Sequence, residues 1–446
     1  MHIRSRILLA LSLAVGVTPV RAENLADVYQ KAAAYDATFA AAQAGYRASL
    51  EKIPQARAAL LPQVSATGSI NRVHQTNTKA MPQTVTYNSP TWGVTAVQAL
   101  FNKQSLIQLD EAHLQARAAA EQLDAAGQNL VLRVAQTYFN VLKAQDDLAS
   151  LQAQKAAIGR QLAYAKRAFE VGTATITDTN EARARFDLAA AQEIAARNQL
   201  EIARRTLDTL TGRPNGALSP LAPRAIFAMP SAGPLDAWVE DARTKNANVR
   251  VQQTLRAIAD KEVQRNRAGH YPTLALTAGY QDQNNQHFGP LSFNNQAASV
   301  GLQLNIPIYQ GGLITAQTRE AAANQQRAQQ NLDDAVRSAL LAARQAYLNV
   351  TNGAAQVKAL EQALHSSEVS LDSTITGLKV GVRTSLDVLN AQQQVYSAWQ
   401  QLSAAKYAYL LATLQLKDAA GILAPQDLAQ LDRYLKAGPP TPPRVQ

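Results

Sequence analysis

The sequence predicts an α+β fold built from two copies of one unit, and three observations support this prediction. A motif occurs twice, at residues 171–178 and 380–387, and its matching Val, Gly, Thr and Asp residues are each 209 positions apart. Long alanine- and glutamine-rich segments without proline flank both copies, as is typical of helices. Four other stretches alternate apolar and small polar residues, as half-buried strands do. Each motif is therefore expected to be the tight turn of a helical hairpin.

Residues 1–22 are predicted to be a secretory signal peptide. Arg4 and Arg6 precede an apolar run at residues 7–17, and Ala22 supplies the small residue expected before a cleavage site. The run is too short for a membrane-spanning helix, and a buried N-terminal helix is the alternative interpretation. Cleavage removes three arginines, so the mature chain from Glu23 carries a formal net charge of +7 instead of +10.

The composition argues against an enzyme, a metal site and a nucleic-acid-binding protein. Cysteine is absent, the six histidines lack metal-ligand spacing, and no glycine-rich phosphate loop or nucleophile elbow occurs. The excess of basic residues is interleaved with Asp and Glu along helices rather than gathered in a block. We therefore expect no catalytic residue, no cofactor, no metal and no nucleic-acid partner.

The first repeat is expected to span residues 23–211. Residues 24–60 are helical, and Asn24 and Asp36 are candidate N-caps for a short helix and a longer one. Proline and asparagine residues, among them Asn88 and Pro90, indicate a loop between two strands. The expected elements are strands at 62–74 and 90–101, a long helix at 104–171 and a return helix at 178–211.

The second repeat is expected to follow a linker at residues 212–234 and to span residues 235–421. Its expected elements are strands at 272–283 and 297–309, a long helix at 313–380 and a return helix at 387–420. A short helical region at 422–436 and a proline-rich, disordered tail at 437–446 complete the chain.

The helices are too long for a compact domain. In the first long helix, apolar residues from Leu123 to Phe169 fall on one heptad seam, which indicates coiled-coil packing. A helix of about 65 residues is about 100 Å long. The return helix is only half as long, and we expect residues 36–60 to stack end to end on it and supply the missing length.

The strands indicate a membrane β-barrel shared between chains. Each strand has about the length that a tilted membrane strand needs, and its second face is formed by Ser, Thr, Gln and Gly. Four strands cannot close a barrel, and their open edges are not tolerated in lipid. Three chains would supply 12 strands, so the predicted fold is a trimeric barrel, with four strands per chain, continuous with a coiled-coil α-helical barrel.

The chain from Glu23 to about residue 435 resembles the TolC family of trimeric outer-membrane exit ducts. The resemblance is carried by residues 22–30, 138–142, 171–178, 307–312 and 380–389. It implies a homotrimer in the cell outer membrane with its helical barrel in the periplasm. It also implies two partners, a periplasmic adaptor and an inner-membrane ABC or proton-driven pump, and a cargo of drugs or type I secreted polypeptides.

The same resemblance implies roles for residues at the hairpin tips. Asp178 and Arg383 match a pair that latches the family's aperture, and Asp387 matches one acid of its constriction ring. Asn390 stands where the ring has a second acid, and Leu378 stands where a latch tyrosine is found, so we expect weaker cation selectivity and a looser latch. The residues expected to meet the adaptor are Val171, Gly172, Thr173, Val380, Gly381 and Val382.

Two other classes of protein compete with this interpretation. A periplasmic coiled-coil adaptor or scaffold without a membrane barrel would share the long helices. Its β-domain would be globular with larger apolar residues inside, whereas the second face of these strands is small and polar. A helical nucleic-acid-binding protein is opposed by the signal peptide and the dispersed charge.

Overall fold

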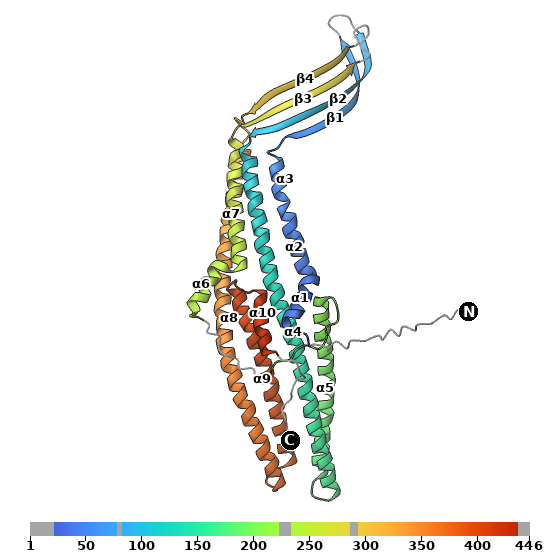
Figure 1. Cartoon of the computed structure of the whole chain (residues 1–446), viewed down its shortest axis with the longest axis vertical. Helices are drawn as coiled ribbons and strands as arrows, with labels where there is room; N and C mark the ends of the chain where they lie inside the picture. Colours follow the sequence, from blue (N-terminus) through green and yellow to red (C-terminus); the bar gives the residue numbers. More distant parts are fainter. Residues whose placement is uncertain (1–21, 78–82, 223–232, 286–292, 436–446) are drawn as a thin grey trace, which may run out of the picture.

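The chain is long and narrow, with a β-sheet at one end and helices running away from it (Figure 1). The computed structural model describes residues 22–77, 83–222, 233–285 and 293–435. The predicted signal peptide (except Ala22), the tail at 437–446 and part of the predicted linker lie outside the described residues. Among the helices of the described ranges, none combines the length and the apolarity needed to cross a membrane.

The first repeat begins with three short helices, α1 (Leu25–Tyr35), α2 (Ala37–Leu50) and α3 (Lys52–Ala58). Both expected N-caps are confirmed. The Asn24 side chain accepts a hydrogen bond from the Asp27 amide at 2.8 Å, and the Asp36 side chain accepts one from the Phe39 amide at 2.7 Å. Each cap satisfies a helix amide that has no partner within the helix. The repeat continues with β1 (Gln63–Asn77), β2 (Gln83–Phe101), α4 (Lys103–Glu170) and α5 (Ile176–Thr211).

The second repeat has the same order of elements. Asn246 caps its second helix as Asp36 does in the first repeat, and accepts a hydrogen bond from the Val249 amide at 3.2 Å. The helix α10 (Pro425–Leu431) follows the repeat. The elements of the repeat are α6 (Leu235–Lys245), α7 (Ala247–Arg267), β3 (Thr273–Asn285), β4 (Phe293–Asn305), α8 (Leu313–Lys379) and α9 (Ser385–Ala419).

The four strands form one antiparallel sheet in the order β1-β2-β3-β4, so β1 and β4 are its edges. The register places apolar side chains of all strands on one face, among them Val64, Ile70, Trp92, Val94, Leu276, Tyr280, Val300 and Leu302. The opposite face carries small and polar residues, among them Ser65, Thr67, Thr95, Thr277, Gly279, Ser299 and Gly301. The alternation expected from the sequence therefore occurs in all four strands, with exceptions such as Gln98 and Asp282 on the apolar face and Val97 on the polar face.

Three expected strand boundaries are wrong by four residues or more, one of them the start of β4, which is Phe293 instead of residue 297. Asn88 and Pro90 belong to β2 rather than to a loop, and β2 starts at Gln83. Pro90 pairs with Ile70 of β1, whereas the pairing of β2 with β3 begins only at Thr91, so on the β3 side no ladder requires the missing N–H. At the other end of the sheet, β4 stops at Asn305 instead of continuing to residue 309. Pro307 lacks the N–H that a longer ladder needs.

The short helices extend the return helices end to end, as expected. Helix α5 stops at Gly212, whose left-handed φ of 73° ends the helix, and the ring of Tyr35 at the end of α1 packs directly against this glycine. Helix α9 ends in the same way before Gly421, which has a φ of 71° and packs against the backbone of Lys245 at the end of α6. A side chain at either glycine would clash, so the two junctions are tight.

The main apolar core lies where these junctions meet the long helices. It includes Tyr138, Leu142, Leu207, Leu410 and Leu428, all nearly or fully buried. The Tyr138 hydroxyl donates toward the carbonyl oxygens of Glu23 at 3.0 Å and Ser219 at 2.9 Å. This residue thereby fixes Glu23 and the segment after α5 to the middle of α4.

Candidate functional site

Both hairpin tips are closed by the same local structure. Gly172 and Gly381 have φ values of 79° and 80°, a left-handed conformation that glycine adopts without strain. After each turn a Thr–Asp capping box starts the return helix, with Thr175 and Asp178 in one hairpin and Thr384 and Asp387 in the other. The repeated motif therefore encodes a rigid turn and the first turn of the following helix.

The tips carry exposed apolar side chains. Val171, Val380 and Val382 are 73%, 69% and 74% exposed, and Gly172, Thr173 and Gly381 are exposed between them. Isolated valines on a surface are ordinary, but here all six residues expected to meet a partner lie at the far ends of two hairpins. The tips therefore offer apolar contacts and an accessible backbone.

The two expected latch residues do not pair within one chain. The Asp178 carboxylate accepts hydrogen bonds from the Thr175 hydroxyl at 2.7 Å and the Thr175 amide at 2.9 Å. No ion pair or hydrogen bond joins Asp178 to Arg383, although the structure describes both residues. Arg383 is exposed, so its guanidinium remains available to another chain.

Gly377 positions Arg383, a role that no pattern in the sequence was taken to indicate. A Cβ atom added at Gly377 would lie 2.7 Å from the Arg383 Cγ, so only glycine leaves room for the aliphatic part of the arginine. The Gly377 carbonyl accepts the Arg383 amide at 3.2 Å. In the first repeat Ala168 occupies the equivalent position, and its carbonyl accepts the amide of Ala174 at 3.2 Å. A comparison of the repeats would have revealed that glycine and arginine change together.

Asp387 is the one acid of the expected ring. Hydrogen bonds from the Thr384 amide at 2.9 Å and hydroxyl at 3.0 Å hold the pKa of its carboxyl below the ordinary value, and the charge of Arg383 adds to this effect. Asp387 is therefore ionised at neutral pH. Leu378 packs beside the buried cluster of Leu371, Val388 and Val395.

Asn390 accepts a hydrogen bond from an arginine that no sequence motif indicated. Arg185 in α5 donates from Nη2 to the Asn390 Oδ1 at 3.0 Å and from Nη1 to the Gln393 Oε1 at 2.6 Å. A second hydrogen bond between the hairpins joins the Gln161 Nε2 in α4 to the Ser385 Oγ in α9 at 2.7 Å. The site therefore contains polar links between the two hairpins of one chain.

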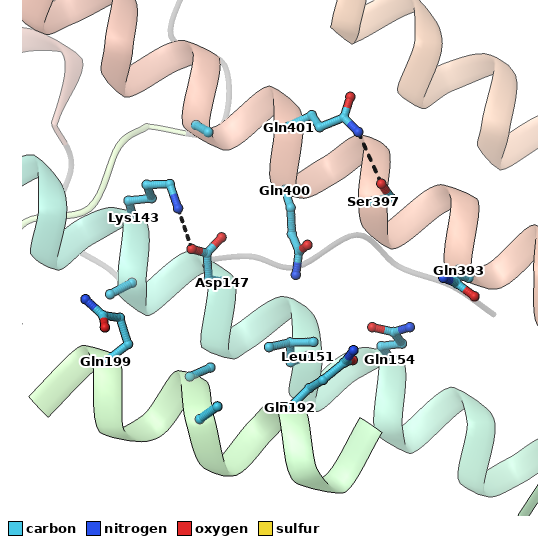
Figure 2. A pocket seen from close by; sticks show the side chains of 14 residues that line it. Lys143, Asp147, Leu151, Gln154, Gln192, Gln199, Gln393, Ser397, Gln400 and Gln401 are labelled. Carbon is cyan, nitrogen blue, oxygen red and sulfur yellow. Dashed lines mark hydrogen bonds and ion pairs between the residues drawn. The ribbon is translucent and has the colours of Figure 1, made fainter. Parts of the chain in front are cut away.

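A polar groove lies along α4, α5 and α9 and reaches these links through Gln393. Figure 2 shows glutamine side chains from all three helices along it. The groove has a volume of about 740 Å³ and contains an ion pair between Lys143 and Asp147, with a distance of 2.7 Å from Nζ to Oδ2. Its glutamines are Gln154, Gln192, Gln199, Gln393, Gln400 and Gln401. Leu151 and alanines of all three helices also line the groove, so polar and apolar side chains share its surface.

Comparisons with known proteins place this architecture in a family. The sequence matches the family described as outer membrane efflux protein over residues 28–213 and 238–422. Outer membrane protein TolC of Vibrio cholerae is 34% identical and covers 96% of this chain and 98% of its own length. Alkaline protease secretion protein AprF of Pseudomonas aeruginosa is 34% identical and covers 91% of this chain and 86% of its own length.

Solved structures share the fold at lower sequence identity. The fold is similar to that of CusC, with a TM-score of 0.79 and 18% identity over 90% of this chain and 92% of that one. It is also similar to that of the outer membrane protein VceC from Vibrio cholerae, with a TM-score of 0.77 and 17% identity over 89% of this chain and 96% of that one. These likenesses concern the fold alone.

Proposed function

This chain belongs to the outer membrane efflux protein family, and from this premise we propose that three copies of it form one exit duct. It is an outer-membrane protein of efflux or secretion and not an enzyme. In the proposed trimer each chain supplies four of 12 barrel strands, and the long helices continue the barrel as a tube through the periplasm.

The unpaired edges of the chain support the trimer. Within one chain, β1 and β4 each hydrogen-bond to a single neighbour, and an open edge in lipid leaves backbone groups without partners. The helices α5 and α8 lie at opposite flanks of the helical part (Figure 1) and carry exposed apolar residues, namely Leu188 and Ile194 on α5 and Leu341 and Leu348 on α8. Joining β4 to β1 and α8 to α5 of the next copy would cover both flanks.

The names of the relatives support a role in export, either of polypeptides or of small molecules. Two of them are named for protease secretion and another for efflux. We therefore assign the chain as the passive outer-membrane component of a tripartite system that exports drugs or secreted polypeptides. A periplasmic adaptor and an inner-membrane ABC or proton-driven pump complete the system, and the adaptor meets the exposed tips around Gly172 and Gly381. The alternative of an adaptor without a barrel loses support because full-length relatives are outer-membrane proteins.

The latch and the ring are proposed to form between chains. Because Arg383 is exposed and does not reach Asp178 in its own chain, we assign its partner as Asp178 of the neighbouring copy. A charge-assisted bond of this kind is directional and reversible. Asp387 would supply three carboxylates to the ring of a trimer, and Asn390 would supply none.

Conductance in planar lipid bilayers tests the duct and the latch. Wild-type trimers are expected to give small discrete current steps, and Arg383→Ala is expected to give larger ones because the latch is lost. Arg167→Ala is the control, since Arg167 is another exposed arginine near a hairpin tip. Equal steps in wild type and Arg383→Ala would refute the latch and leave the duct intact. Folded protein that neither forms trimers nor inserts into bilayers would refute the duct.

A further inference from the structure

We propose that Arg185 links the two hairpins of each chain near the tip and places a positive charge beside position 390 of the aperture. This inference rests on the proposed duct, and it assigns to Arg185 a positioning role that the latch residues do not explain. The link lies within one chain, so it is present before any second copy binds.

The contact of Arg185 with Asn390 and Gln393, called the tie below, has well-defined geometry. Arg185 projects from α5 toward α9, where Asn390 and Gln393 lie one turn apart on the same face. A planar guanidinium presents parallel N–H donors, and here two of its nitrogens meet two amide oxygens, at 3.0 Å and 2.6 Å. The arginine side chain is 29% exposed, so water competes with these bonds only in part.

Two further contacts join the two hairpins at about the same distance from the tips as the Arg185 contact. The Gln161 side chain is only 8% exposed and donates to the Ser385 hydroxyl at 2.7 Å. Leu389, directly before Asn390, is buried in a cluster formed with Ile158, Ala165, Ala182 and Ala189 of the first hairpin. A polar bond on either side of an apolar contact therefore fixes α9 against the first hairpin over its first three turns.

The charge of this contact determines the selectivity of the aperture. Both partners of Arg185 in α9 are neutral, and the carboxylate of Glu181 approaches its guanidinium only to 3.9 Å. The Arg185 guanidinium therefore places a positive charge beside Asn390, and this charge opposes the attraction of cations by Asp387. An acid placed at 390 would meet this guanidinium and form an ion pair rather than act as a free ring charge.

Current recordings of the full mature trimer in planar bilayers, with substitutions at positions 185 and 390, test this inference. Arg185→Gln is compared with Arg183→Gln, because Arg183 lies two residues away, is exposed, and forms no hydrogen bond or ion pair with a described residue. Loss of a hydrogen-bonded charge at such a site changes an equilibrium about fivefold, so the ratio of open to closed occupancy should rise about fivefold in Arg185→Gln only. Arg185→Lys is expected to restore part of the closure.

The ratio of potassium to chloride permeability then separates a charge role from a structural one. Asn390→Asp should leave this ratio nearly unchanged when Arg185 is present and should raise it in the Arg185→Gln background. An equal rise in both backgrounds would overturn the inference, because it would mean that Arg185 does not contact position 390 in the trimer. Equal occupancies for Arg185→Gln and Arg183→Gln would overturn the tie. Folded wild-type protein that neither forms trimers nor inserts into bilayers would instead contradict the duct itself.

Discussion

Replacement of Tyr138 by phenylalanine tests the hydrogen bonds that hold Glu23, the predicted start of the mature chain, and Ser219. The tyrosine is fully buried, and its hydroxyl lies 3.0 Å from the Glu23 carbonyl and 2.9 Å from the Ser219 carbonyl. Burial raises the pKa of this hydroxyl far above its ordinary value, so it remains a donor at any physiological pH. The Glu23 carbonyl also accepts the Ser219 amide at 2.9 Å and so keeps one partner in the variant.

The expected cost follows from the carbonyl that loses its donor. The variant keeps the ring and the packing and removes only the hydroxyl, which leaves the Ser219 carbonyl without this hydrogen bond in a buried place. Such a loss costs about 1–2 kcal/mol of local stability. That free energy corresponds to about 5- to 30-fold faster opening of the segments around Glu23 and Ser219.

Hydrogen–deuterium exchange of peptides covering residues 22–30 and 216–222 measures this opening directly. The matched control is Tyr347→Phe, since Tyr347 is the equivalent residue of the second repeat and its hydroxyl makes no hydrogen bond with a described residue. Exchange should accelerate only in Tyr138→Phe. Unchanged exchange in these peptides, or an equal acceleration in the control, would refute the reasoning.

Two more predictions concern positions where a single group determines the outcome. In Gly377→Ala the added methyl group displaces the Arg383 side chain, whereas alanine also favours the helix more than glycine does. The current steps in planar bilayers should therefore be larger than in wild type, but smaller than in Arg383→Ala. Ala168→Gly is the control, and steps equal to wild type would contradict this role of Gly377. Burial raises the pKa of Asp146 against the opposing hydrogen bonds from Ser403 and Tyr407. The folded chain therefore binds a proton more tightly than the unfolded chain, and the associated stability is lost as pH rises from 3.8 through the folded value. The unfolding temperature should therefore fall as the pH rises through this range in wild type and in Asp147→Asn, but not in Asp146→Asn. A fall of equal size in Asp146→Asn would contradict the assignment.

Local chemistry made most of the fold predictable. Asn24 and Asp36 were recognisable as caps because the side chain and the amide it binds are three residues apart. The hairpin turns were recognisable because the Gly172 motif recurs in register at Gly381. Pro90 misled the prediction, because its position in β2 depends on where the neighbouring strand ends rather than on its own sequence.

The candidate site was only partly predictable, because some of its contacts join residues that are far apart in the sequence. The motif identified Asp387, whose partner Thr384 is close in the sequence. Arg185 and Asn390 are 205 residues apart, and no spacing in either segment indicates that α5 and α9 meet there. Such a contact follows from the packing of two hairpins, which local patterns do not encode.

The mass of the purified mature protein in detergent tests the central claim most directly. Native mass spectrometry is expected to show a particle of three chains, because only additional copies can pair the open edges β1 and β4. The particle should also require detergent to remain in solution. A folded single chain or a dimer that stays in solution without detergent would contradict the trimeric duct and favour a periplasmic scaffold.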